Sequence, residues 1–232
     1  DPNDVKYRDV FLKNFNFAVL ENHLKWPFWE EWGRPDGEKA LEWLNKQGVP
    51  VRGHTIIWPG HGNLPKDFPS LAGKPAEMRA RIEGRFQDII AATKGKVVEW
   101  DVVNEPYSNN DVMRTLGWGE MAAWFRRAKQ LDPKPRLTLN DYPPLDGDDL
   151  MNAHLNHFYG QIEALQKAKA PIEAIGFQCH MGSRPIPPTS LLKGLDRFSK
   201  FGLPIVVTEF DMENTETDLQ ARYMRDFMTA LF

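Results

Sequence analysis

Short apolar runs alternate with longer amphipathic segments along almost the whole chain. Most of the short runs are continuously apolar, which is typical of strands in a parallel sheet that is covered on both faces. Apolar runs that alternate with helices predict an α/β fold with right-handed crossovers. The runs predicted as strands are residues 16–21, 51–58, 97–104, 136–141, 174–180 and 204–210.

The longer segments have the spacing of amphipathic helices. Residues 37–48 end at Gly48, which is placed like a helix stop. In residues 75–93 and 149–168 the apolar side chains recur at helical spacing and so form one stripe on each helix. The stripe residues are Met78, Ile82, Phe86, Ile89 and Ile90 in the first helix, and Leu150, Phe158, Ile162 and Leu165 in the second.

Polar or aromatic side chains stand at the carboxyl end of every predicted strand. In a (β/α)8 TIM barrel the active site is built at that end. A doubly wound open sheet also binds ligands there, but through a glycine-rich phosphate turn, and the sequence contains no such motif. A barrel is therefore favoured, with six of its eight βα units visible in a partial domain spanning residues 1–232. The strand-end residues are Glu21, Asn22, Trp58, Asn104, Glu105, Asn140, Asp141, Gln178, His180, Glu209 and Asp211.

Two of these strand-end residues are glutamates, Glu105 in WDVVNEP (100–106) and Glu209 in VTEFD (207–211). An ionised carboxylate is costly to bury unless it is paired or its pKa is raised. Glycosidic hydrolysis requires two carboxylates that face one sugar with different pKa values. A single glutamate at a strand end is often only a helix cap or an ion-paired group, but two at matching strand ends favour catalysis.

Composition and charge argue against several classes of partner and site but do not identify one function. The net charge is −3 with no long basic run, so nothing favours nucleic acid or an anionic membrane as partner. No apolar stretch approaches the length of a membrane span. The single cysteine, Cys179, excludes an intrachain disulfide and a cysteine-based zinc site. Because the chain starts at Asp1, it is interpreted as an excised or processed segment.

Six motifs, in the same order and spread over nearly the whole chain, resemble those of glycoside hydrolase family 10, the endo-β-1,4-xylanases. The resemblance implies strands 2 to 7 of the barrel, with the first and eighth strands outside this segment. Such a fragment would have two open sheet edges, which proteins normally avoid. The motifs are ENHLKW (21–26), RGHTIIW (52–58), WDVVNEP (100–106), LNDY (139–142), IGFQCH (175–180) and VTEFD (207–211).

The resemblance also implies a role for each matching residue. Glu105 would be the general acid/base and Glu209 the nucleophile of a retaining reaction, with carboxyl groups about 5–5.5 Å apart. Asn104 would hydrogen-bond the 2-hydroxyl of the sugar at the cleavage site, and Gln178 would lie beside the acid/base. His180 and Asp211 would orient Glu209. The remaining predicted site residues are Asp141 in a supporting role, His54 and Trp58 at the sugar on the non-reducing side, and Glu21, Asn22 and Lys25 at the next sugar.

Some of these residues have simpler interpretations. His54 and His180 could be hydrogen-bonded structural histidines, and Trp58 could be core packing. His154 and His157 stand three apart on a predicted helix but lack an acidic partner at metal-binding spacing, so a packed or solvated face is favoured. Pro59 departs from the histidine that many relatives have after the third-strand tryptophan.

The function predicted from sequence is a secreted or periplasmic endo-β-1,4-xylanase that uses no metal or cofactor. Its partner would be xylan or xylo-oligosaccharides, with carbohydrate-binding modules as further parts outside this segment. A related barrel glycosidase acting on another β-glycan is the second interpretation. A non-catalytic carbohydrate-binding barrel is the third, although a pure binding protein has no need of both Glu105 and Glu209.

Overall fold

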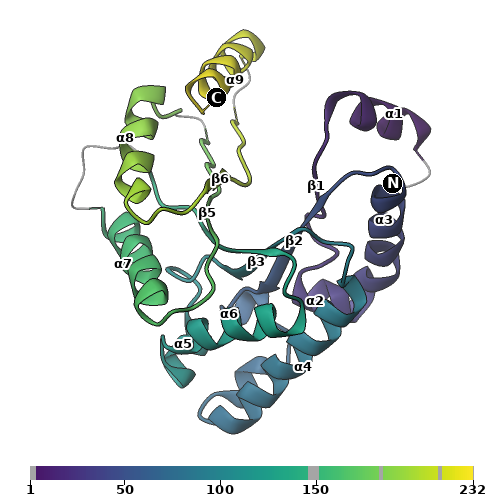
Figure 1. The fold of residues 1–232 in the computed structure, drawn as a ribbon, viewed down its shortest axis with the longest axis vertical. Helices are drawn as coiled ribbons and strands as arrows, with labels where there is room; N and C mark the ends of the chain where they lie inside the picture. The colour runs from purple at the N-terminus through teal and green to yellow at the C-terminus, as the bar shows by residue number, and fades with distance from the viewer. Residues whose placement is uncertain (1–3, 146–151, 183–184, 214–215, 232) are drawn as a thin grey trace.

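The computed structural model describes residues 4–145, 152–182, 185–213 and 216–231. Its strands form one parallel sheet in which neighbours in sequence are neighbours in space, in the order β1-β2-β3-β4-β5-β6 (Figure 1). This order is that of successive βα units in a barrel and confirms the predicted fold. The strands are β1 (Ala18–Val19), β2 (Val51–Ile57), β3 (Glu99–Asn104), β4 (Arg136–Asp141), β5 (Ala174–Phe177) and β6 (Ile205–Val207).

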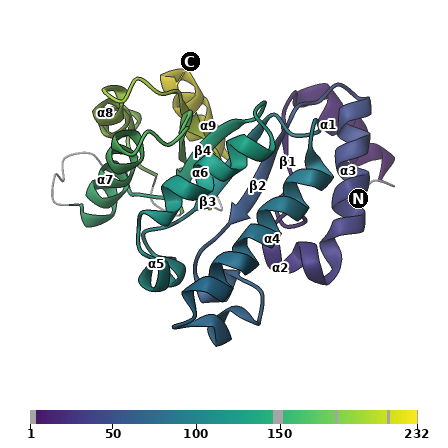
Figure 2. The ribbon, with the colours of Figure 1, turned by 60° about the horizontal axis from the view of Figure 1, so that its bottom comes forward.

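Helices lie outside the curved sheet and cover it (Figures 1 and 2). The predicted helix at residues 75–93 is α4, and its five stripe residues are all buried. In the helix predicted at 149–168, Phe158, Ile162 and Leu165 are buried, whereas Leu150 lies outside the described residues. The α-helices are α1 (Val5–Asn14), α2 (Trp26–Phe28), α3 (Arg34–Lys46), α4 (Pro75–Thr93), α5 (Asp111–Leu116), α6 (Glu120–Leu131), α7 (Ala153–Lys167), α8 (Pro188–Ser199) and α9 (Thr217–Leu231). The others are the π-helix η1 (Trp29–Gly33) and the 3-10 helices η2 (His61–Asn63) and η3 (Phe68–Leu71).

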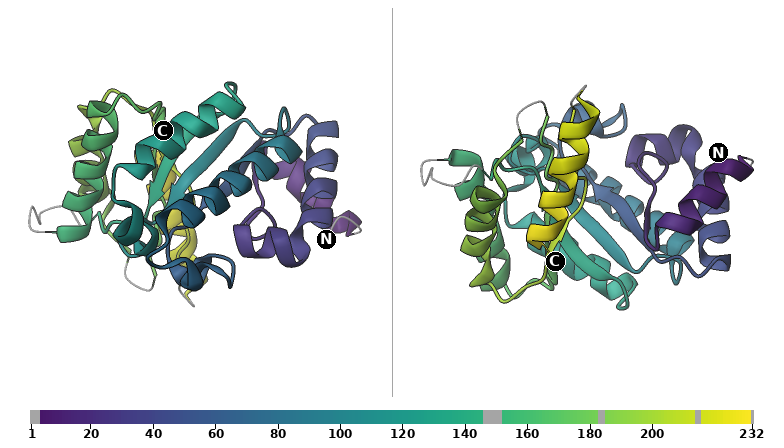
Figure 3. Two further views of the ribbon diagram at one scale, coloured as in Figure 1. Left: turned by 90° about the horizontal axis from the view of Figure 1, so that it is seen from below. Right: turned by 90° about the horizontal axis from the view of Figure 1, so that it is seen from above.

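The middle of the sheet is covered more completely than its two edges. Every residue of β2, β3 and β5 is buried, whereas the three residues of β6 are only half-buried and Val19 in β1 is 39% exposed. Helix α1 has no buried residue. Helices α1 and α9 lie near opposite ends of the sheet (Figure 3). The interior strands are therefore covered on both faces, as their continuous apolar runs predict.

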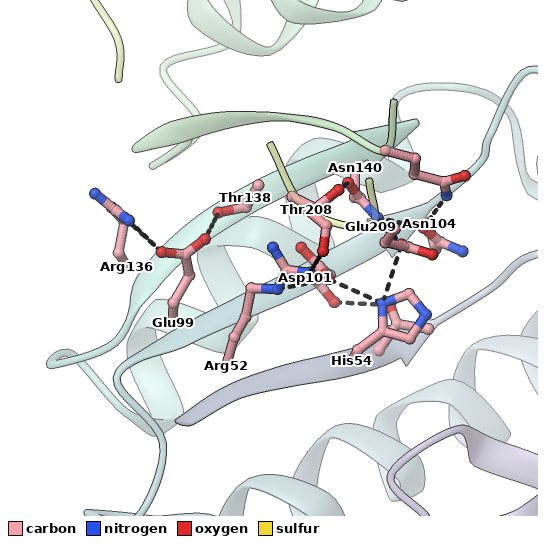
Figure 4. A network of polar contacts seen from close by, with 12 residues as sticks. Arg52, His54, Glu99, Asp101, Asn104, Arg136, Thr138, Asn140, Thr208 and Glu209 are labelled. Atoms are coloured by element: carbon pink, nitrogen blue, oxygen red, sulfur yellow. Dashed lines mark hydrogen bonds and ion pairs between the residues drawn. The ribbon is translucent and has the colours of Figure 1, made fainter. Parts of the chain in front are cut away.

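Charged side chains lie buried within the apolar strands β2 and β3. The carboxylate of Glu99 is paired with Arg136 and accepts a hydrogen bond from the hydroxyl of Thr138 at 3.1 Å. Arg52 Nε lies 3.4 Å from Asp101 Oδ2, and both side chains are almost completely buried (Figure 4). Buried charges are stable only when they are paired. These pairs therefore set the register between β2, β3 and β4 beneath the carboxyl ends of the strands.

None of the helices in the described part of the chain is long and apolar enough to cross a bilayer.

A close approach between β2 and β3 predicts opposite effects of two glycine substitutions. A Cβ on Gly53 would lie 2.3 Å from Trp100 Cε3 in the neighbouring strand, and the buried indole ring has nowhere to move. We expect Gly53→Ala to lower the free energy of unfolding by about 1–3 kcal/mol. Gly84 is exposed in α4 with nothing near its added Cβ, so Gly84→Ala should raise the free energy of unfolding by about 0.5–1 kcal/mol. Unfolding midpoints in guanidinium chloride check both predictions. Equal midpoints for the two variants would contradict the close packing of Gly53 against Trp100.

Candidate active site

The sheet ladder continues past the last residues of β3 and β6 and places two glutamates at its carboxyl end. The backbone N–H of Glu105 donates to the carbonyl of Asn140 at 2.9 Å, and that of Glu209 donates to the carbonyl of Gln178 at 3.1 Å. The backbone of each glutamate is thus hydrogen-bonded to a neighbour in the sheet: Glu105 to a residue of β4, and Glu209 to the residue directly after β5. Both side chains are half-buried.

Two side-chain amides hold the carboxylate of Glu105. Gln178 Nε2 donates to its Oε1 at 2.9 Å, and Asn109 Nδ2 donates to its Oε2 at 3.1 Å. Burial raises the pKa of Glu105, and the negative charges of Asp141 and Glu209 raise it further, whereas the hydrogen bond from Gln178 acts in the opposite direction. A carboxyl group that stays protonated to higher pH is suited to act as a general acid.

A different set of groups surrounds Glu209. Asn140 Nδ2 donates to its Oε1 at 2.7 Å. His180 Nε2 lies 3.6 Å from its Oε2, and His54 Nδ1 lies 3.8 Å from its Oε1. The other ring nitrogen of His180, Nδ1, lies 2.5 Å from Asp211 Oδ2. Asn140 is thus the side chain that donates a hydrogen bond to Glu209, and the two imidazole rings lie beside the same carboxylate.

Asn140 is the penultimate residue of β4 and links the surroundings of the two glutamates (Figure 4). Its Nδ2 donates to Asn104 Oδ1 at 2.9 Å as well as to Glu209. Its Oδ1 accepts from the hydroxyl of Thr208 at 2.7 Å, and Asn104 Oδ1 also lies 3.3 Å from Gln178 Nε2. Asn104 Nδ2 is buried and has no partner among the described residues, so this donor remains available to a ligand.

His54 is oriented by the buried charges of the sheet. Its Nδ1 lies 2.9 Å from Asp101 Oδ2, the same oxygen that Arg52 approaches. Arg52 in turn donates through Nη2 to the carbonyl of Thr208 at 2.9 Å, next to Glu209. The ring of His54 is therefore fixed from beneath by β3 and lies on the Glu209 side of the cluster.

Lys25 and Asn22, two of the residues predicted to bind the outer sugar, lie beside Trp58, and Glu21 is in the same turn. Lys25 Nζ lies 5.3 Å above the ring centre of Trp58 and donates to Asn22 Oδ1 at 3.1 Å. Trp58 is half-buried and its Nε1 has no partner among the described residues. Glu21 is exposed at the start of the turn that follows β1.

Asp141 is paired with His154. His154 Nε2 lies 2.9 Å from Asp141 Oδ1, and the backbone N–H of Tyr142 donates to the same oxygen at 2.8 Å. His154 is buried and stacks on Tyr107, with ring centres 4.2 Å apart. The helix face that carries it is therefore packed, in agreement with the sequence analysis. Among the described residues, no group of three or more His, Cys, Asp or Glu side chains could hold a metal ion.

Sequence reasoning missed several residues of this cluster. Asn140 was recognised only as a strand-end residue, and its position beside Glu105 and Glu209 could have suggested a role. The buried charges of Arg52 and Asp101 were visible as charged residues inside apolar runs. The contact of Asn109 with Glu105 depends on how the following loop turns back, for which the sequence carries no signal.

Two carboxylates at the carboxyl ends of parallel strands, one with a raised pKa and one that accepts a hydrogen bond from Asn140 beside two histidines, form the arrangement typical of barrel glycosidases. The model of the family described as "Glycosyl hydrolase family 10" matches residues 2–232. The chain belongs to this family.

Relatives agree with the family match and cover the chain almost completely. Endo-1,4-beta-xylanase B of Thermotoga neapolitana is 32% identical over 220 residues, which are 90% of this chain and 62% of that protein. Endo-1,4-beta-xylanase 1 of Arabidopsis thaliana is 32% identical over 228 residues, which are 97% of this chain and 24% of that protein. The chain thus spans less than two thirds of the length of these relatives.

Solved structures show the same fold. Xylanase 10B from Thermotoga petrophila in complex with xylobiose superimposes with a TM-score of 0.82 and 29% identity, covering 98% of this chain and 72% of that one. A family 10 structure from Paenibacillus barcinonensis superimposes with a TM-score of 0.84 and 26% identity, covering 100% of this chain and 74% of that one. The strands described above are therefore part of a (β/α)8 barrel.

The raised pKa of Glu105 predicts how its replacement changes stability with pH. The folded state binds this proton more tightly than the unfolded state, so ionising Glu105 costs folding free energy as pH rises from 4.5 through the folded pKa. Glu105→Gln removes that cost. We expect the stability of the variant relative to the wild type to increase between pH 4 and pH 7, measured by urea unfolding at each pH. A difference that stays constant or falls with pH would contradict the buried environment of Glu105.

Proposed function

We propose that the protein is a retaining endo-β-1,4-xylanase that hydrolyses the xylan backbone by double displacement. The observation that carries this proposal is the convergence of Glu105 and Glu209 on one hydrogen-bonded cluster through Asn140, Asn104 and Gln178. The xylanases among the relatives and the xylobiose complex of the Thermotoga petrophila enzyme support xylan as the substrate class. These relatives are longer than this chain, so the xylanase activity is proposed for the whole protein.

In the first step Glu105 acts as the general acid. Its proton passes to the glycosidic oxygen while Oε1 or Oε2 of Glu209 attacks the anomeric carbon. The bond between that carbon and the leaving oxygen breaks, and a glycosyl ester forms on Glu209. The environments of the two carboxylates fit these roles, because burial favours the protonated form of Glu105 and the Asn140 amide holds Glu209 in place through a hydrogen bond to its Oε1.

In the second step Glu105, now ionised, acts as the general base. It removes a proton from water, the water oxygen attacks the anomeric carbon, and Glu209 leaves as a carboxylate. Asn104 Nδ2 would donate to the 2-hydroxyl of the reacting sugar, since it has no protein partner in the described part of the chain. A donor at this hydroxyl stabilises the transition state of both steps.

The non-reducing side of the cleft is assigned to the residues on β2 and after β1. His54 and Trp58 would contact the sugar next to the scissile bond. Lys25 and Asn22, which are hydrogen-bonded to each other, and the exposed Glu21 would contact the next sugar outward. Hydroxyl groups of a polymer need such fixed donors and acceptors, and Trp58 offers an apolar ring face.

Because polysaccharides of this kind lie outside cells, we propose that the enzyme acts outside the cytoplasm, in the medium or in the periplasm. We also propose that carbohydrate-binding modules accompany the catalytic domain. The relatives that extend far beyond the aligned part, such as the Arabidopsis protein, leave room for further domains.

The function is tested by product release from polymers. We expect the full-length parent protein to release short xylo-oligosaccharides from xylan, and Glu209→Ala to release none because the nucleophile is absent. Reducing-sugar assays and chromatography of the products, with cellulose in parallel, measure this. Release from cellulose but not xylan would favour another β-glycan, and binding to xylan without any release would favour a carbohydrate-binding barrel.

The acid/base assignment makes a prediction that depends on the leaving group. Glu105→Ala should slow cleavage of xylo-oligosaccharides by about 10²–10⁴-fold, because a sugar leaving group needs protonation. An aryl xyloside with a nitrophenol leaving group needs little protonation, so its first step should be slowed far less. Pre-steady-state release of nitrophenol and oligosaccharide cleavage rates give the two values. Equal losses on both substrates would contradict this role for Glu105.

A further inference from the structure

The loop after Glu105 turns back and brings Asn109 beside the carboxylate. The backbone N–H of Asn109 donates to the carbonyl of Glu105 at 3.0 Å, which closes one turn. Within this turn Asn109 Nδ2 donates to Glu105 Oε2 at 3.1 Å and also lies 3.2 Å from Ser108 Oγ. The family motif ends at Pro106, so Asn109 lies outside the residues whose roles the resemblance implied.

The orientation of the Asn109 amide is fixed by a second loop. Asn63, in η2 after β2, donates through Nδ2 to Asn109 Oδ1 at 2.8 Å. With its oxygen engaged in this way, the amide presents its nitrogen to Glu105. A Cβ on Gly60 would lie 2.5 Å from Asn109 Oδ1, so the amide is also packed tightly against the backbone of this loop.

Backbone contacts hold the two loops together. The N–H of Val112 donates to the carbonyl of Pro59 at 3.1 Å, and the N–H of His61 donates to Asp111 Oδ2 at 2.9 Å. Asn109 therefore lies between two anchored segments. Pro59 is the first residue of the loop that supports it.

We propose that Asn109 is a positioning residue of the acid/base: Asn63 orients its amide, and the amide fixes Oε2 of Glu105 and favours the ionised carboxylate. This inference rests on the proposed function of Glu105 as acid/base. An amide N–H can donate to a carboxylate oxygen but cannot accept from a carboxylic acid, so the contact is stronger when Glu105 is ionised. Ionised Glu105 is the form that the second, base-catalysed step requires.

The other groups that face Glu105 come from the remaining strands. Asp141 from β4 and Glu209 after β6 carry negative charge and favour the protonated form, whereas His54 from β2 acts in the opposite direction. Gln178 after β5 donates to Oε1. Gln178 thus partly offsets burial and the two negative charges at Oε1, and the Asn109 amide occupies Oε2. Removing the Asn109 donor shifts this balance toward the protonated form.

The pH dependence of kcat/KM on a xylo-oligosaccharide tests the proposal. Loss of the donor in Asn109→Ala should move the basic limb to higher pH by about half a pH unit. Asn109→Asp should move the basic limb further, because a negative charge next to Glu105 disfavours ionisation.

Gly60→Ala should act like Asn109→Ala by displacing the amide of Asn109, since the extended backbone at Gly60 accommodates alanine. Gly62→Ala, whose added Cβ meets nothing within 4 Å, is the matched control and should superimpose on the wild type.

A titration that does not depend on turnover separates this inference from the proposed function. The Glu105 carboxyl carbon, labelled with ¹³C and assigned with Glu105→Gln, should titrate at higher pH in Asn109→Ala than in the wild type. An unchanged titration and an unchanged basic limb would overturn the role of Asn109. A wild type that cleaves no β-glycan would overturn the proposed function, while the titration still decides whether Asn109 favours the ionised carboxylate. Should Asn109→Ala fail to fold, Asn63→Ala gives the same test by freeing the amide.

Discussion

The buried ion pair between Arg52 and Asp101 is the interaction on which the site depends. Asp101 is completely buried, so its charge is tolerable only because Arg52 and His54 both face one of its oxygens. The pair joins β2 to β3, and Arg52 extends to the carbonyl of Thr208, the residue before Glu209. One guanidinium thus connects the strand that carries His54 with the segment that carries Glu209, and removing it would leave the charge of Asp101 without its cationic partner in the sheet.

Above this layer, two glutamates of identical chemistry acquire different properties from their neighbours. Burial raises the pKa of Glu105, and the negative charges of Asp141 and Glu209 raise it further, against the hydrogen bond from the neutral amide of Gln178. Glu209 meets Asn140 and two imidazoles. The difference follows from which strand ends lie next to each glutamate, and the parallel order of the sheet fixes those neighbours.

The sequence predicted the fold and the strand ends well, because continuous apolar runs and a strict βα alternation leave few topologies. The convergence of Glu105, Gln178 and Asn104 follows from the rule that parallel strands end on one face. Edge strands were less predictable: β1 contains two residues where six were expected, since it pairs on one side only. The contacts of Asn109 and His154 depend on loop paths and on long-range packing, which local patterns do not encode.

The surroundings of Glu105 involve a conflict between stability and reactivity. A salt bridge to the carboxylate would favour its ionised form, but it would lower the pKa of Glu105 and remove the acid that the proposed first step needs. Full burial without donors would raise the pKa so far that the base required by the second step would be scarce. Neutral amides from Gln178 and Asn109, one on each oxygen, meet both requirements because they orient the group without adding a charge. Residues that donate but do not titrate are therefore the side chains expected around a carboxyl group that must change its protonation state twice in each turnover.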